Sequence, residues 1–392
     1  MKSKKKYLIM IPLLFLSTLI YVGCQPLREF NRIPAYQGDT HYNPLPLIYD
    51  SSKKTVAIIA KTEGTEIFDL MAPFYLLNAA EKANVYIVAE KKNPIALLKG
   101  VFAMPNLTFK EMDSLKIQPD VIVLPAMVKV FKEPNSATIK WIKEKYNDKT
   151  KILSVCAGSL VASATGIYDG KTVTTHASDF AESKAYFKKP NWVSNIAVTQ
   201  EGNLYSTAGV SNAVEGSLTI INDLFGTETL HKVMDEIHYP YSKIKTEHQS
   251  LAVATRNKFT IANKLIFKKN RHVGVLLQNG INELALAAVL DTYSRSFPAS
   301  NQTVVLNGSS VKSKYGLLLF PTAKMDTIKL DELHVLMPEN FLASESKKFG
   351  TASIVSYSLA TKPYIIDTCL KRISEQYGNK FKNITKLLLD YN

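Results

Sequence analysis

The chain has 392 residues, with 48 Lys and Arg against 34 Asp and Glu, and it contains three cysteines. This length is enough for two ordinary domains, and so few cysteines exclude a disulfide framework. The seven histidines have no metal-ligand spacing, so we expect no metal and no cofactor. The basic residues form no cluster interleaved with aromatic residues, so we expect no nucleic-acid partner.

The segment 1–24 has the layout of an export signal. "MKSKKK" is a basic start, and the apolar run after it ends at Gly23-Cys24. A small residue before cysteine is typical of a bacterial lipobox, which predicts lipidation at Cys24. The alternative is an uncleaved helix, because about 18 apolar residues are just enough to span a bilayer. Both interpretations predict an extracytoplasmic protein that is anchored to the bacterial cell membrane and has a basic exterior suited to an anionic surface.

Regular structure is expected only after a tether. Residues 25–54 are rich in Pro, Asn and Tyr and have no periodicity, which predicts a linker that lifts the folded part off the membrane. Beyond it, short apolar runs alternate with segments of helical periodicity. This predicts strands at 55–60, 84–90, 120–126 and 151–155, and helices at 66–83, 136–147 and 157–165. Such alternation is typical of an α/β domain with a mostly parallel sheet.

The sequence also repeats itself. The segment that begins at Val56 is similar to the one at Val273, Pro125 matches Pro338, and 215–226 matches 367–378 without a gap. The interval between the last two matches is much shorter in the second copy, which lacks the stretch that holds Cys156 and His176 in the first. We therefore expect two flavodoxin-like three-layer sandwich domains in tandem, the second one shortened. The expected divisions are a signal or anchor at 1–24, a tether at 25–54, a first domain at 55–242, a linker at 243–270 and a degenerate second domain at 271–392.

Cys156 lies at a tight corner between the strand at 151–155 and the helix that ends at Gly166. Such a corner projects above the carboxyl edge of the sheet, where open α/β sheets bind ligands. The helix N-terminus favours a thiolate, so we expect a lowered pKa for Cys156. Ala157 and Gly158 would leave their amides free to face an oxyanion. The corner predicts a nucleophile elbow with sulfur in place of oxygen; the alternative is a small residue that packs well in a turn.

The segment "ILSVCAGSLVASATGIYDGKTVTTHASDF" resembles the cysteine elbow of the ThiJ/PfpI superfamily, in the class I glutamine amidotransferase-like fold. The resemblance covers about residues 55–241 and is closest to isocyanide hydratases and to the N-terminal domains of AraC-type regulators. It implies that Asp69, on the first helix, approaches the cysteine and that His176 pairs with it. It further implies that Ala126 contributes to the oxyanion hole and that Thr175 lines the pocket. The second copy has Ala285 at the position of Asp69, as expected of a dead site.

Two functions remain open from the sequence. The first is cysteine-dependent, cofactor-independent hydration or hydrolysis of a small molecule. The second is a non-enzymatic sensor or binding protein related to the regulator domains. PfpI-type peptidases carry a histidine directly after the nucleophile, where this chain has Ala157, so peptidase activity is not expected. Members of the superfamily usually dimerise, and we expect the two copies to pack as an intrachain pseudo-dimer.

Overall fold

The structure is a computed structural model that describes residues 25–38, 46–358 and 364–392. The predicted signal or anchor segment, with Cys24, lies outside these residues. Within the described ranges, no helix has the length and apolar character needed to cross a membrane.

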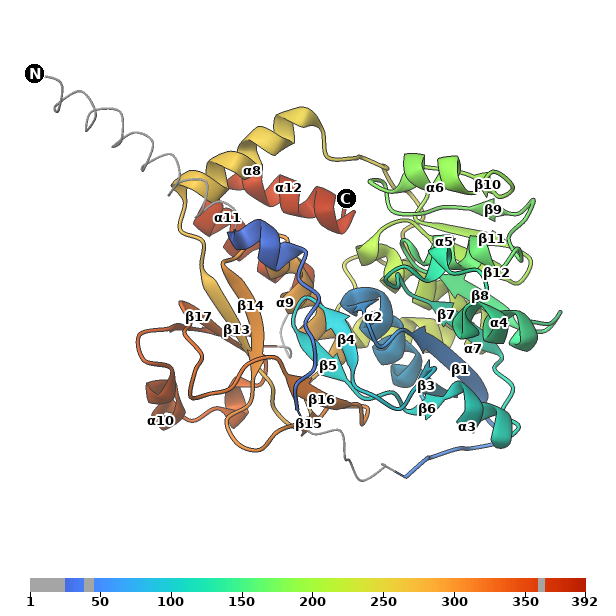
Figure 1. Cartoon of the computed structure of the whole chain (residues 1–392), viewed down its shortest axis with the longest axis horizontal. Helices are drawn as coiled ribbons and strands as arrows, with labels where there is room; N and C mark the ends of the chain where they lie inside the picture. Colours follow the sequence, from blue (N-terminus) through green and yellow to red (C-terminus); the bar gives the residue numbers. More distant parts are fainter. Residues whose placement is uncertain (1–24, 39–45, 359–363) are drawn as a thin grey trace, which may run out of the picture.

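A seven-stranded sheet forms the centre of the N-terminal half, residues 46–242 (Figure 1). Its strand order is β11-β12-β8-β7-β1-β3-β6, and every pairing is parallel except that of β11 with β12. The strands are β1 (Lys54–Ala60), β3 (Ala83–Ala89), β6 (Leu107–Thr108), β7 (Val121–Leu124), β8 (Lys151–Ser154), β11 (Val198–Glu201) and β12 (Leu204–Thr207). The prediction of an α/β domain with a mostly parallel sheet is therefore confirmed.

Helices cover both faces of this sheet because its strands are apolar on both sides. Along β1, Val56 and Ile58 belong to one core cluster, whereas Ala57 and Ile59 belong to the other. The first cluster includes α2 (Ile67–Ala79) and α7 (Ala213–Glu236), and the second includes α3 (Phe109–Ser114), α4 (Ala137–Lys145) and α5 (Gly158–Ala164). Helix α6 (Phe180–Tyr186) lies beyond this layer, beside the small parallel pair β9 (Thr172–Val173) and β10 (Asn191–Trp192).

The C-terminal half, residues 271–392, has a second parallel sheet. Its order, β14-β13-β17-β18, repeats the order β3-β1-β7-β8 of the first sheet. The elements are β13 (His272–Leu276), α9 (Glu283–Ser294), β14 (Ser300–Val304), β17 (Glu332–Val335), β18 (Ser353–Ser356), α11 (Ile365–Tyr377) and α12 (Asn379–Leu389). The long helices cover one face only. Loops and the short helix α10 (Ala343–Ser346) cover the other, so this half differs from the three-layer sandwich that the repeat predicts.

Local geometry supports the gapless match between the two ends of the repeat. Gly226 kinks α7 at φ 82° and ψ 171°, and Gly378 separates α11 from α12 at φ 87° and ψ 162°. Both conformations favour glycine. Each copy also has a tyrosine hydroxyl that donates to the carboxylate at the start of the preceding helix, in the pairs Tyr239 with Glu215 (2.8 Å) and Tyr391 with Asp367 (2.9 Å).

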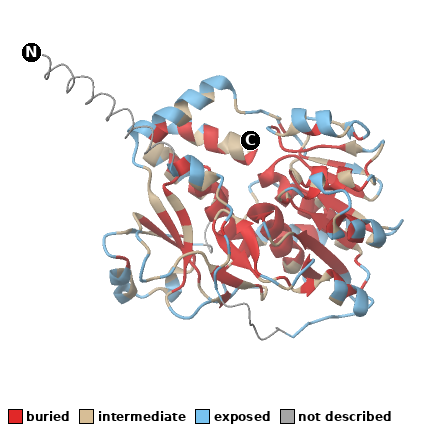
Figure 2. Ribbon diagram, in the orientation of Figure 1, coloured by how far each residue is buried: buried red, intermediate tan, exposed pale blue. Residues whose placement is uncertain are grey.

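The two halves share one core. Helices α2 and α9 pack against each other, and one cluster of buried apolar residues continues through both halves (Figure 2). A five-stranded sheet is assembled from both, in the order β15-β16-β5-β4-β2, with β16 antiparallel to β5. Its strands are β2 (Thr65–Glu66), β4 (Ile95–Leu98), β5 (Val101–Ala103), β15 (Val311–Lys312) and β16 (Leu318–Pro321).

Two stretches expected to be connectors carry structure. The expected linker at 243–270 contains helix α8 (Thr255–Phe267), which contacts α12. The start of the expected tether is helical at 25–30 and packs on the C-terminal half. The Gln25 side chain donates to the Ala299 carbonyl at 3.3 Å, and the Phe30 and Phe297 rings lie 4.9 Å apart.

Candidate cysteine site

Cys156 forms a strained corner between β8 and α5. Its φ of 54° lies in the left-handed region, which is uncommon for a residue with a side chain. Such strain persists where the surroundings fix it, as at a nucleophile elbow. Gly158 makes the corner possible, because a Cβ atom there would come within 1.9 Å of the Leu124 carbonyl oxygen on β7. Gly158 therefore serves close packing, and its N–H donates to the Val155 carbonyl at 2.7 Å rather than facing an oxyanion.

Buried hydroxyl groups hold the corner in place. Ser159 Oγ and Thr175 Oγ1 both donate to the Cys156 carbonyl oxygen, at 2.9 and 3.1 Å. The Cys156 N–H donates to Thr207 Oγ1 at 3.3 Å. Thr175, expected to line the pocket, thus supports the backbone of the elbow.

Two acidic side chains at the start of α2 lie next to the elbow. Glu66 caps the helix, and its Oε2 accepts from the Asp69 N–H at 2.7 Å. Asp69 is fully buried, and its Oδ2 accepts from the Ala126 N–H at 3.0 Å. The Ala126 amide expected in an oxyanion hole is therefore already used. The other carboxyl oxygen of Asp69, Oδ1, has no hydrogen-bond partner in the described structure, which is unusual for a buried polar atom.

Burial makes the site hold its protons tightly. Burial raises the pKa of Glu66 to about 7, and burial together with the charge of Glu66 raises the pKa of Asp69 well above its ordinary value. The pKa of Cys156 is also raised well above its ordinary value, first by burial and then by Asp69, while the amide of Ala157 lowers it to a lesser extent. The expected low thiol pKa is therefore wrong. Cys156 is only 5% exposed, and the removal of water raises its pKa by more than the helix N-terminus lowers it.

An arginine from the C-terminal half enters this site, and the sequence analysis missed it. Arg295, directly after α9, places its guanidinium 3.1 Å from Asp291 Oδ2 and 3.8 Å from Glu66 Oε1. Burial lowers its pKa, but Asp291 and Glu66 outweigh this, and the Cys156 thiolate adds to the net rise. The packing of α2 on α9, which the repeat implies for a pseudo-dimer, was the signal that could have directed attention to the end of α9.

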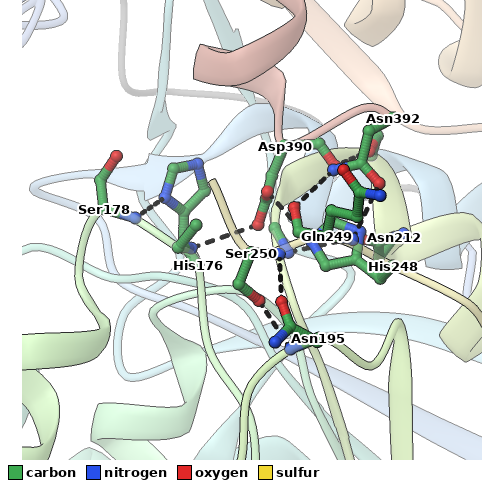
Figure 3. Close-up of polar contacts among 12 residues, drawn as sticks. His176, Ser178, Asn195, Asn212, His248, Gln249, Ser250, Asp390 and Asn392 are labelled. Carbon is green, nitrogen blue, oxygen red and sulfur yellow. Dashed lines mark hydrogen bonds and ion pairs between the residues drawn. The ribbon is translucent and has the colours of Figure 1, made fainter. Parts of the chain in front are cut away.

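His176 is close to the elbow in sequence but has other partners (Figure 3). Its Nδ1 accepts from the Ser178 N–H at 3.0 Å, and its Nε2 lies 3.3 Å from the Leu388 carbonyl. This pattern places the ring proton on Nε2. Neither ring nitrogen is hydrogen bonded to Cys156 among the described contacts, so the expected Cys–His pair is not formed in this structure.

The C-terminal segment packs beside His176, on its neighbour Ala177. Asp390 Oδ2 accepts from the Ala177 N–H at 3.2 Å, and its Oδ1 lies 3.0 Å from His248 Nε2, with both side chains buried (Figure 3). Gly209 leaves room for this contact, since a Cβ there would lie 2.0 Å from that of Asp390. In the described ranges, no three His, Cys, Asp or Glu side chains converge as metal ligands.

The N-terminal half is similar in sequence to known proteins. The model of the DJ-1/PfpI family matches residues 54–223. Isonitrile hydratase from Pseudomonas putida is 28% identical over 177 residues, which are 44% of this chain and 72% of that protein. The Parkinson disease protein 7 homolog from Danio rerio is 28% identical over 188 residues, 47% of this chain and 95% of that protein.

Solved structures of the same group also match. DJ-1beta from Drosophila melanogaster is 21% identical with a TM-score of 0.43, over 48% of this chain and 100% of that one. A THiJ/PfpI family protein from Pseudomonas syringae is 21% identical with a TM-score of 0.42, over 54% of this chain and 84% of that one. The family match and the curated relatives confirm the predicted resemblance: residues 54–223 form a domain of the DJ-1/PfpI family.

Proposed function

We propose that the chain is a cofactor-independent hydratase or hydrolase that uses Cys156 to act on a small molecule with an electrophilic carbon. The observation that carries the proposal is the fixed position of a thiol on a strained elbow beside Asp69, whose buried Oδ1 is unpartnered among the described residues. The similarity of residues in this half to isonitrile hydratase supports the hydratase class.

The chemistry follows from two groups that hold their protons. As the sulfur of Cys156 bonds to the electrophilic carbon, Asp69 donates its proton to the substrate and takes up the thiol proton, so that S and H are both added to the substrate; with an isonitrile both are added to its carbon, which gives a thioimidate. Water then bonds to the same carbon, the C–S bond breaks, and the sulfur regains a proton through Asp69. The net reaction is the addition of one water molecule. General acid–base catalysis of this kind contributes roughly 10²- to 10⁴-fold to the rate.

Arg295 compensates the acidic surroundings of the thiol. Glu66, Asp69 and Asp179 all disfavour a thiolate at Cys156. The Arg295 guanidinium, from the C-terminal half, provides a positive charge against them. Its charge therefore stabilises negative charge that develops on sulfur during the reaction. The C-terminal half thus contributes a positive charge to the site, although it has no cysteine elbow of its own.

The test is an assay of small isonitriles for conversion to formamides by the full chain. Cys156→Ser and Asp69→Asn should each lower the rate by about 100-fold or more. Cys369→Ser is the matched control, because Cys369 is a buried residue of α11 whose sulfur contacts the Tyr357 hydroxyl rather than the site. Equal rates for the wild type, Cys156→Ser and the control would contradict the proposal.

A sensor is the second candidate, and the closure of the site favours it. Cys156 and His176 are both buried, and the Leu388 carbonyl near the C-terminus lies against the His176 ring. A sensor would bind its ligand without turnover, so ligand should raise the thermal midpoint of Cys156→Ser as much as that of the wild type. Turnover that requires Cys156 would exclude a purely sensing role.

The chain is anchored outside the cytoplasm, as a basic start, an apolar run and Gly23-Cys24 support. Palmitate labelling of the wild type and Cys24→Ala tests lipidation, and an unlabelled chain that still sediments with membranes would indicate an uncleaved helix instead.

The second half is a duplicate of the first that lost its elbow, as the repeated strand order supports. Its packing through α2 and α9 takes the place of a dimer. Light scattering should give a monomer, and a stable dimer at micromolar concentration would contradict this.

A further inference from the structure

Helix α8 carries large apolar side chains on both of its sides: Leu265 is buried in the core and Ile261 packs against it, while other apolar residues face solvent. The side turned to the protein carries Lys264, which is 2% exposed and donates to the Phe297 carbonyl at 2.5 Å. The side turned to solvent carries Phe259 and Phe267, which are 74% and 71% exposed. The protein core covers Leu265 and Ile261, but it leaves the two aromatic side chains of the outer side uncovered. The outer face therefore has the character of a surface that another apolar phase covers.

The exposed apolar residues are continuous along the helix. Phe259, Ala262 and Ile266 are spaced at i, i+3 and i+7, which puts them on one face, and Phe267 is adjacent. We call these four residues the α8 stripe. All four are exposed, so the stripe spans most of the helix.

The ends of the stripe are positively charged. Arg256 and Lys258 lie at the start of α8, and Lys268 and Lys269 follow its end. No acidic residue occurs between residues 251 and 270. Lys269 pairs with Asp331, whereas the other three cations have no ion pair among the described residues. A lipid interface with anionic headgroups matches both the stripe and its basic ends.

The stripe also lies where the predicted anchor enters the folded part. Helix α8 and the helical segment 25–30 pack on the same turn: Lys264 bonds to the carbonyl of Phe297, Phe30 stacks on the ring of Phe297, and Gln25 bonds to Ala299. Both segments lie on the same side of the molecule (Figure 1). Residue 25 directly follows the apolar run and Cys24, so a bilayer that holds this run is within reach of α8.

We infer that α8 is a membrane-docking helix: its stripe enters the interface of an anionic bilayer, and its basic ends contact phosphate headgroups. Docking at this second point, besides the anchor, fixes the orientation of the folded part on the membrane. The inference does not depend on the chemistry at Cys156, and it rests on the proposed anchor only for location.

The experiment uses the full chain reconstituted in vesicles of phosphatidylglycerol and phosphatidylcholine that contain brominated lipid. Tryptophan reporters replace the two aromatic residues of the stripe, in Phe259→Trp and Phe267→Trp. Leu342→Trp is the matched control, because Leu342 is 64% exposed at the start of α10, away from α8. The wild-type signal gives the background of the two native tryptophans. Stripe residues that sit roughly 5–10 Å inside the interface should lose about half of their emission or more, while the control loses little.

Two comparisons make the result decisive. A Lys258→Glu/Lys268→Glu double variant in the Phe267→Trp background should recover emission in anionic vesicles, as should vesicles of phosphatidylcholine alone. In one outcome, the vesicles carry the chain while acrylamide in the water quenches the stripe reporters as strongly as Leu342→Trp. That result would overturn docking of α8 and leave the proposed anchor intact. Reporters shielded from acrylamide but not quenched by brominated lipid would also overturn it, because they would indicate a protein partner or a second copy of the chain.

Discussion

The buried carboxyl group of Glu66 should make the protein less stable as the pH rises. Its pKa is 4.5 when the chain is unfolded and about 7 in the fold, because burial and Asp291 outweigh the attraction of Arg295. The folded state therefore binds this proton more tightly than the unfolded state does. Below about pH 4.5, Glu66 is protonated in both states and does not lower the free energy of unfolding. As the pH rises from there towards 7, the free energy of unfolding falls, and above pH 7 this loss stays constant. A shift of this size corresponds to about 3 kcal/mol of unfolding free energy.

Glu66→Gln removes the charge but keeps an oxygen that can accept from the Asp69 N–H, so the helix cap is preserved. We expect the variant to be more stable than the wild type at pH 8, by up to about 3 kcal/mol, and to lose most of this advantage at pH 5. Urea unfolding at both pH values, followed by the fluorescence of buried Trp141, measures the difference. Glu63→Gln, on the exposed loop before α2, is the control. If Glu66→Gln and the wild type lose equal stability between pH 5 and 8, the reasoning is refuted.

Three further outcomes are expected. Arg295→Met leaves its carboxylate partners uncompensated in a buried site and should lower stability by about 3–5 kcal/mol, measured as a shift of the urea midpoint at constant slope. Gly158→Ala should prevent stable folding because no space exists for its methyl group, whereas Gly170→Ala, with nothing within 4 Å, should cost only about 1–2 kcal/mol in thermal unfolding. Asp69→Asn removes an ionisable carboxyl group that raises the thiol pKa, so iodoacetamide should alkylate Cys156 faster at pH 8; an unchanged or slower rate would instead support a hydrogen bond from the carboxyl group to sulfur.

Local patterns in the sequence predicted the local structure well. The apolar runs became β1, β3, β7 and β8, within a residue or two of their expected bounds. The elbow was predictable because a strand, a small residue pair and a helix in direct succession leave few backbone solutions. Gly166, expected to end the helix, adopts a φ of 79°, as a C-terminal glycine does. The repeat aligned Gly226 with Gly378, and in the structure these two glycines break the helices at matching places.

The partners of the site residues could not be predicted in the same way, because they lie far away along the chain. His176 contacts the backbone at Leu388, and Arg295 reaches Glu66 from the other half. The Ala126 amide was expected to be free, but the Asp69 carboxyl occupies it. The thiol pKa depends on how completely the fold excludes water, and a motif contains no information about that. Each of these errors concerns tertiary packing rather than the identity of an element.

The mixed sheet has a consequence for how the chain reaches its folded state. One edge of β5 pairs with β4, which is close to it in sequence. Its other edge pairs with β16, which belongs to the C-terminal half. Until β16 has emerged, the N-terminal half presents an unpaired edge to every other chain in its surroundings, and such edges promote aggregation. β16 and the turn before it therefore protect the edge of β5 from intermolecular pairing, apart from any role at the Cys156 site.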